Sequence, residues 1–117
     1  METHKVREGT ASKYSCTVVD ETDTAIEPAS MTTMVLTIYD QATDADIVTA
    51  RDVLNANGGV LGAGGAFSYV FTAADNTIQG TDSVEKHIAL FEWTFNAGAR
   101  SGKHAIKLMV ENLGKVS

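Results

Sequence analysis

The chain has 117 residues, of which 44% are hydrophobic and 21% are charged, and its formal net charge is −6. These proportions are typical of one folded domain with a single core, and they exclude a disordered chain. The acidic balance, with no basic stripe, argues against nucleic acid as the main partner. The sequence has no long apolar run, and its first residues lack the apolar stretch of a signal peptide, so we expect no membrane partner and no secretion.

The first ten residues are polar, with Val6 the only sizeable aliphatic side chain, and we expect a flexible N-terminal arm over residues 1–10. Residues 11–117 are predicted to form one β-sandwich domain. Within it, the alternation of Tyr14, Cys16 and Val18 predicts a strand over residues 11–19. Cys16 is the only cysteine, so an internal disulfide is excluded, and we interpret it as a small buried side chain.

The middle of the chain alternates between apolar strands and polar or glycine-rich connections. Strands are predicted over residues 31–40 and 66–72, with a further short one over residues 47–50. Residues 51–57 are compatible with one helical turn, which asparagines and Gly58 would end. The glycine-rich residues 60–65 are predicted to form a flexible loop. We do not expect a phosphate-binding loop here, because Ala66 and Phe67 follow the last glycine instead of a lysine and a hydroxyl residue.

Residues 85–113 are predicted to form a long β-hairpin with arms over residues 85–95 and 103–113. If Trp93 faces Ile106 and Phe91 faces Leu108, the large apolar residues of both arms lie on one face. A two-stranded ribbon cannot bury such a face alone, so a second sheet must cover it. The sequence therefore predicts an all-β, antiparallel β-sandwich with a long C-terminal hairpin.

No catalytic, cofactor-binding or metal-binding residue is predicted. His87 and His104 lie near opposite ends of the expected hairpin, which argues against a shared metal site. No motif places a nucleophile beside a base and an orienting group, so catalysis is not predicted. The acidic turns around Asp20 and Asp44 offer oxygen atoms suited to calcium, but their spacing does not match an EF-hand, so calcium binding stays open.

The face of the hairpin opposite the core also carries apolar residues. Ile88 and Leu90 lie on it, with Leu90 opposite Met109 in the expected register. A contiguous apolar patch of this kind predicts either a partner protein or an overlying segment of the same chain.

Several stretches of the chain resemble a small β-sandwich protein found among the structural genes of tailed bacteriophages. These stretches are residues 31–40, 55–59, 74–76, 85–94 and 110–116. The resemblance implies an immunoglobulin-like virion component, either a capsid decoration (cement) protein or a neck or tail accessory protein. It brings no catalytic residue.

The first hypothesis is therefore a non-enzymatic protein, located on the virion and assembled in the host cytoplasm, that stabilises the particle in many symmetric copies. Its partners would be the major capsid protein, other virion proteins or further copies of itself. The predicted contact residues are the patch, the hairpin tip and the arm: Ile88, Leu90, Met109, Arg100, Lys5 and Val6. The alternative is a carbohydrate-binding or adhesin-like module, for which Tyr39, Tyr14 and Tyr69 are the candidate aromatic platforms.

Overall fold

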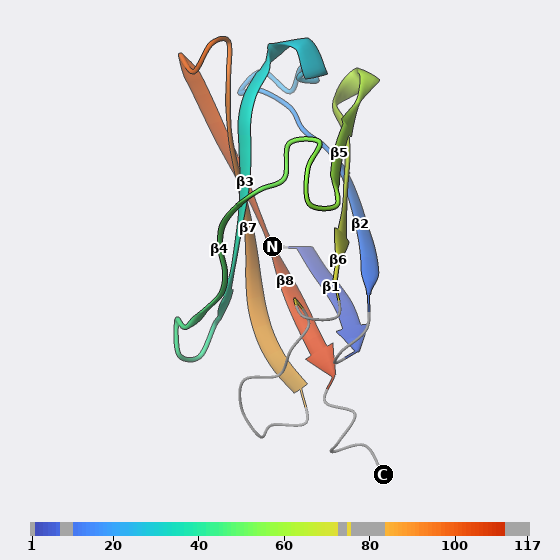
Figure 1. Ribbon diagram of the computed structural model, residues 1–117, viewed down its shortest axis with the longest axis vertical. Coiled ribbons are helices and arrows are strands. Elements are labelled where there is room, and N and C mark those ends of the chain that lie inside the picture. The colour runs from blue at the N-terminus through green and yellow to red at the C-terminus, as the bar shows by residue number, and fades with distance from the viewer. Residues whose placement is uncertain (1, 8–10, 73–74, 76–83, 112–117) are drawn as a thin grey trace.

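Eight strands and two short 3-10 helices make up the described part of the chain, which in this computed structural model comprises residues 2–7, 11–72, 75 and 84–111. They form a five-stranded sheet with the order β1-β8-β7-β3-β4 and a three-stranded sheet with the order β2-β6-β5. Figure 1 shows β3, β4 and β7 on one side and β2, β5 and β6 on the other. The strands are β1 Glu2–Arg7, β2 Ser12–Thr17, β3 Met31–Asp40, β4 Asp46–Asp52, β5 Gly59–Gly62, β6 Ala66–Phe71, β7 Val84–Phe95 and β8 Arg100–Glu111, and the helices are η1 Pro28–Ser30 and η2 Ala63–Gly65.

The strand order is that of an immunoglobulin-type sandwich. In that fold the second, fifth and fourth strands (B, E, D) form one sheet, and the last two strands join the third (G, F, C) in the other. Here β2-β6-β5 and β8-β7-β3 reproduce the two sets, with β4 added beside β3 and β1 added in parallel beside β8. The all-β sandwich predicted from the sequence is confirmed.

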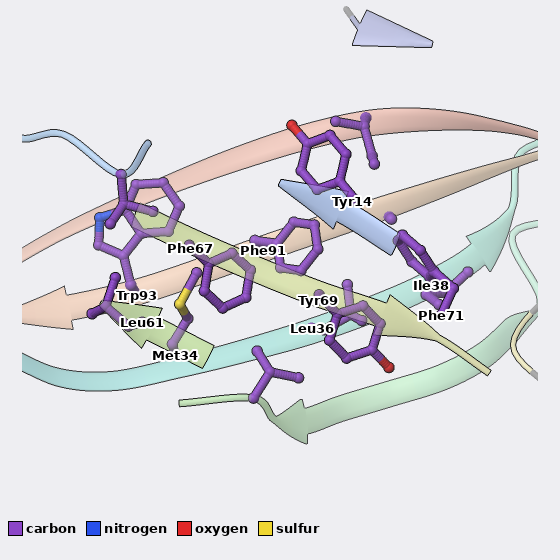
Figure 2. Close-up of a cluster of buried hydrophobic side chains, with 14 of the residues drawn as sticks. Tyr14, Met34, Leu36, Ile38, Leu61, Phe67, Tyr69, Phe71, Phe91 and Trp93 are labelled. Atoms are coloured by element: carbon purple, nitrogen blue, oxygen red, sulfur yellow. The ribbon is translucent and has the colours of Figure 1, made fainter. Parts of the chain in front are cut away.

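The two sheets meet in an aromatic core. The ring of Phe91 on β7 lies 5.5 Å from that of Phe67, 6.0 Å from that of Tyr69 and 6.1 Å from that of Tyr14. Figure 2 shows these rings clustered among strands of both sheets. Trp93 and Phe95 are also buried, so the predicted core face of the hairpin is confirmed. Burial of this apolar surface provides the main stabilisation of the sandwich.

The hairpin register differs from the expected one. Phe91 faces His104, Trp93 faces Gly102 and Phe95 faces Arg100, a shift of four residues along the second strand. The shift is even, so every side chain keeps its predicted face. The turn is shorter than expected because Gly102 belongs to β8. A Cβ on Gly102 would lie 2.6 Å from the Trp93 indole nitrogen, so this glycine accommodates the ring.

Six residues of the predicted arm form a strand. β1 pairs in parallel with residues 106–111 of β8, and Val6 is buried in the core. The sequence did not predict this strand, because Val6 is its only sizeable apolar side chain and no apolar alternation is visible. Met1 and residues 8–10 lie outside the described residues.

Two predictions for the middle of the chain are wrong. Arg51 and Asp52, expected in a helical turn, continue strand β4. Part of the expected glycine-rich loop forms β5, which pairs with β6. Gly59 fits there because a Cβ on it would overlap the carbonyl group of Val53.

Some predictions cannot be compared with the structure. Residues 73–83, between the predicted strand over residues 66–72 and the predicted hairpin, lie outside the described residues, apart from Asp75. The last two residues of the predicted hairpin, Asn112 and Leu113, do so as well. In the described part of the chain, no helix has the length and apolar character needed to cross a membrane.

Candidate protein-binding face

The outer face of the five-stranded sheet carries side chains in ordered rows across the strands. One row runs through Thr3, Lys107, Ile88, Tyr39 and Asp46, on β1, β8, β7, β3 and β4 respectively. A second row runs through Lys103, Glu92, Val35 and Asp52. Each row has a lysine on the β8 side and an aspartate on the β4 side.

The predicted apolar patch lies on this face, with a different arrangement. Ile88 is only 3% exposed and lies between Lys107 and Tyr39. Leu90 is half-buried and pairs with Ala105 and not with Met109, so the predicted Leu90–Met109 pair is wrong. The register shift is the cause.

Met109 lies nearer one end of the same face. It is half-buried and pairs with Lys86 on one side and Lys5 on the other. The structure thus brings Ile88 and Leu90 together on β7, while Met109 lies among lysines.

The two residues predicted from the arm have opposite orientations. Lys5 is exposed on the outer face of β1. Val6 instead points into the core, where its side chain is 6% exposed. Alternation along a strand requires this difference, and it removes Val6 from the surface available to a partner.

Arg100, predicted as a contact at the hairpin tip, is engaged within the chain. Its guanidinium group pairs with the carboxylates of Glu21 and Asp20 and lies 4.9 Å from the centre of the Phe95 ring. The residue therefore joins the loop after β2 to the start of β8. Such exposed ion pairs contribute little stability individually.

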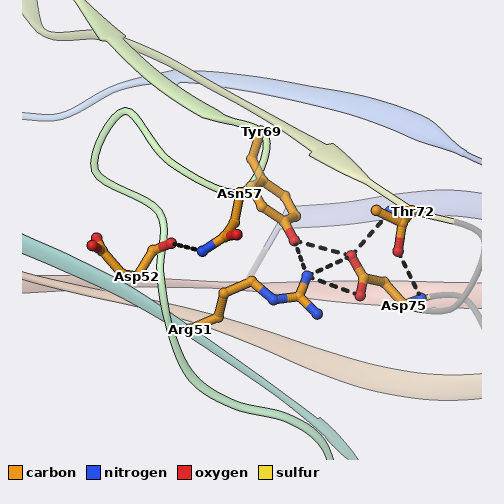
Figure 3. A network of polar contacts seen from close by, with 6 residues as sticks. All are labelled: Arg51, Asp52, Asn57, Tyr69, Thr72 and Asp75. Carbon is orange, nitrogen blue, oxygen red and sulfur yellow. Dashed lines mark hydrogen bonds and ion pairs between the residues drawn. The ribbon is translucent and has the colours of Figure 1, made fainter.

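A polar network closes one side of the sandwich (Figure 3). The Arg51 guanidinium donates to the Tyr69 hydroxyl at 2.6 Å and to the two Asp75 carboxylate oxygens at 3.0 and 3.2 Å. The Tyr69 hydroxyl donates to Asp75 at 2.9 Å, and so does the backbone N–H of Thr72 at 3.0 Å. The buried carboxylate of Asp75 is therefore paired and hydrogen-bonded, as a buried charge must be.

Burial and the neighbouring charges alter the ionisation of this network. Burial, reinforced by the Asp75 carboxylate, raises the pKa of Tyr69 to about 12. Burial alone would lower the pKa of Arg51, but its contacts with Tyr69 and Asp75 outweigh burial and raise it. The phenol therefore stays protonated and the guanidinium stays charged, which is the state that holds β4 to β6.

A second buried polar pair lies on the inner face of β7. His87 is fully buried, and its Nε2 atom lies 2.5 Å from a carboxylate oxygen of Glu85. Its Nδ1 atom has no hydrogen-bond partner in the described part of the chain. The pair fixes the orientation of the ring next to β8.

The acidic turns use their carboxylates to hold their own backbone. Asp20 accepts hydrogen bonds from the Thr22 hydroxyl and from the N–H groups of Thr22 and Thr24, and these bonds lower the pKa of Asp20. Asp40 accepts from the N–H of Ala42 and the hydroxyl of Thr43. Among the described residues, no group of three or more His, Cys, Asp or Glu side chains is arranged to hold a metal ion.

A surface hollow of about 570 Å³ lies beside the β3–β4 turn. Its lining residues include Asp40, Thr43, Glu85 and Lys86. The carboxylates of Asp40 and Glu85 are already bonded to the turn and to His87. Both groups thus have structural partners.

No family model matches the chain, and no curated protein matches it. The site must therefore be interpreted from its own geometry.

Sequence reasoning missed the Arg51–Tyr69–Asp75 network. One signal was present: Tyr69 stands between Phe67 and Phe71 on a buried strand face, and a buried tyrosine hydroxyl requires a partner. The identity of that partner could not be inferred, because Arg51 was expected in a helical turn, and no local pattern shows that Asp75, just after the strand of Tyr69, turns back towards its hydroxyl.

Proposed function

We propose that this chain is a non-enzymatic structural protein that acts by binding other proteins through the outer face of its five-stranded sheet. The observation that carries the proposal is the ordered outer face, with the partly exposed apolar side chain of Leu90 in its centre, next to the covered Ile88, and charged residues on both flanks. An apolar centre with a polar rim is the usual composition of a specific protein interface.

The interior supports the same proposal. The Arg51–Tyr69–Asp75 network joins β4 to β6, and the Glu85–His87 pair fixes two neighbouring side chains on β7. With the aromatic core between the sheets, they form a stiff body. A stiff body holds its contact residues in place and so loses little conformational entropy on binding.

The setting that we propose is the virion of a tailed bacteriophage, with the chain as a capsid decoration (cement) protein. This part rests on the resemblance described above. The major capsid protein would then be the partner, and many symmetric copies would bind to the particle.

Purified particles provide the test. We expect mass spectrometry to find this chain in copy numbers comparable to those of the major capsid protein. Particles made without the chain should release their DNA at a lower temperature, and added purified protein should restore the original temperature. Far fewer copies would favour a neck or tail accessory protein, and absence of the chain from particles would refute the virion setting.

The alternative, a carbohydrate-binding module, needs exposed aromatic platforms. Tyr14, Tyr69, the four phenylalanines and Trp93 are all buried, and Tyr39 is half-buried on the outer face. Tyr39 alone is a small platform. Binding on a glycan array that is lost in Tyr39→Ala would favour this alternative.

A further inference from the structure

We infer that the outer face of the five-stranded sheet pairs with the same face of a second copy, about a two-fold axis parallel to β7. The inference rests on the proposed function, since it names one partner for the proposed binding face. Its basis is a division of charge across that face.

One half of the face is basic. Lys5 and Arg7 on β1 and Lys103 and Lys107 on β8 belong to it, and Lys86 on β7 adjoins it. This half also holds the carboxylate of Glu111, which is the neighbour of Arg7 across the β1–β8 pair. The outward-facing cations of β1 and β8 are four of the nine lysine and arginine residues of a chain whose net charge is −6.

The other half is acidic. Asp46 and Asp52 are exposed at the two ends of β4, and Asp44 is exposed in the turn that precedes it. Between the halves, β3 presents only uncharged residues to this face in the rows that it shares with β7, namely Thr33, Val35, Thr37 and Tyr39. The face is therefore positive towards β1 and negative towards β4.

This pattern is complementary to itself under one symmetry operation. A two-fold axis that lies in the interface along β7 places the β1–β8 half of each copy over the β3–β4 half of the other. Lys107 then approaches Asp46 of the partner copy, and two equivalent clusters of opposite charge form. An axis perpendicular to the strands would place lysines against lysines, and we exclude it for that reason.

The size of the face suits a stable dimer. The five strands contain 47 residues in all. At about 3.4 Å per residue and about 4.8 Å between strands, they cover about 770 Å². This area is close to the roughly 800 Å² that one partner contributes to a standard interface. Leu90 lies close to the axis, where its partly exposed apolar side chain is best shielded from water, and the neighbouring Ile88 is already covered in one copy.

Two charged residues of β7, Lys86 and Glu92, lie near the axis, and each faces its own symmetry mate. Lys86 is exposed towards one end of the strand, where solvent and salt weaken the repulsion between the two ammonium groups. Glu92 has Lys103 as its neighbour on β8 in each copy, and the two Lys103 side chains offset the repulsion between the two carboxylates.

The outer face of the smaller sheet lacks such a pattern. Val60 and Val70 are 57% and 41% exposed there, and Lys13 is the only charged side chain that β2, β5 and β6 turn outward. This face has no charge complementarity to select a second copy, and it supplies matched control positions.

Sedimentation velocity of the full chain over a range of protein concentrations tests the inference. We expect a monomer–dimer equilibrium that weakens as the salt concentration rises. Leu90→Asp should abolish the dimer, whereas Val70→Asp on the opposite face should leave it unchanged. Circular dichroism of each variant verifies that it folds.

A charge exchange tests the orientation. Lys107→Glu and Asp46→Lys should each weaken dimerisation about tenfold, because each places like charges together. The double variant should recover the affinity of the original chain. The two positions are three strands apart in one copy, so recovery must arise between copies. Lys13→Glu is the control and should have no effect.

The outcomes separate this inference from the proposed function. A chain that stays monomeric at every concentration, or a dimer that tolerates Leu90→Asp and both charge changes, overturns the inference. If such a chain still binds particles and Leu90→Asp prevents that binding, the proposed function stands without the dimer. A dimer with the expected variant behaviour that never occurs on particles supports the inference and contradicts the virion setting.

Discussion

Gly102 illustrates how a single residue sets the geometry of the long hairpin. It faces Trp93 across the β7–β8 pair, and the indole lies where a side chain at position 102 would stand. A strand glycine covered by an aromatic ring loses little stability, because the ring shields the backbone from water. The glycine that was expected to belong to the turn instead makes room for the largest side chain of the core.

Gly102→Ala should therefore destabilise the protein. The added Cβ would lie 2.6 Å from the indole nitrogen and force Trp93 out of position, which we expect to cost about 1–3 kcal/mol. Urea unfolding followed by Trp93 fluorescence measures the effect. Gly62→Ala is the matched control, since a Cβ there meets its nearest atom at 3.6 Å. Equal stability of the two variants would contradict the proposed packing.

Tyr69 makes the free energy of unfolding fall as the pH rises into the alkaline range. Its pKa is about 12 in the folded protein and about 10 in an unfolded chain, so the unfolded state alone releases the proton between these values. The contribution of Tyr69 is therefore complete below about pH 10 and falls by about 1.4 kcal/mol per pH unit above it. We expect the stability advantage of the original chain over Tyr69→Phe to decline over this interval in urea unfolding.

Ultraviolet titration at the phenolate band provides a separate check. Three tyrosines are present, and one should titrate near pH 12 in the folded chain. That late step should be missing from Tyr69→Phe. If all tyrosines ionise together near their ordinary pKa, Tyr69 is not held in the network with Asp75.

At the scale of elements, β1 is the strand whose existence most changes the interpretation of the chain. It extends the sheet beside β8 and inserts Val6 into the core. Amide hydrogen exchange should therefore be slow at alternate residues of β1, as in any paired strand. Val6→Ser should abolish this protection and cost about 1–3 kcal/mol. The control is Lys5→Ser, an exposed change on the same strand, which should preserve both the exchange protection of β1 and the free energy of unfolding. Fast exchange at β1 in the original chain would indicate a flexible arm.

The strands that the sequence predicted well are those with apolar alternation. β3 was located residue for residue, because Met34, Leu36 and Ile38 alternate with residues that face outward. β1 and β5 were missed because one is almost wholly polar and the other is rich in glycine. Their stability comes from pairing with β8 and β6, which no local pattern reveals.

The candidate face was predictable only in part. Alternation was enough to place Ile88, Leu90 and Met109 on the same outer face. The rows across the sheet depend on register, and register depends on the turn. The expected turn began at Asn96 and ended at Gly102, whereas the observed turn closes earlier through positive φ angles at Asn96, Ala97 and Gly98. The division of charge between β8 and β4 became visible only with the correct register.

At the scale of the whole molecule, the sandwich has one core shared by both sheets. Phe91 on β7 contacts rings from β2 and β6, so the same side chain stabilises the five-stranded and the three-stranded sheet. Neither sheet can lose its partner without exposing aromatic surface. The two sheets should therefore unfold together, in a single cooperative transition.

Phe91→Ala tests this coupling. It removes a ring that is 1% exposed and should cost about 3–5 kcal/mol. Loss of strand signal in far-ultraviolet circular dichroism and loss of Trp93 fluorescence should coincide in the variant as in the original chain, both at a lower urea concentration. Val70→Ala, on the outer face of β6, should leave both signals with the same urea midpoint as in the original chain. Two separate transitions would mean that the sheets fold independently, and the outer face would then lack the rigid support that a binding surface requires.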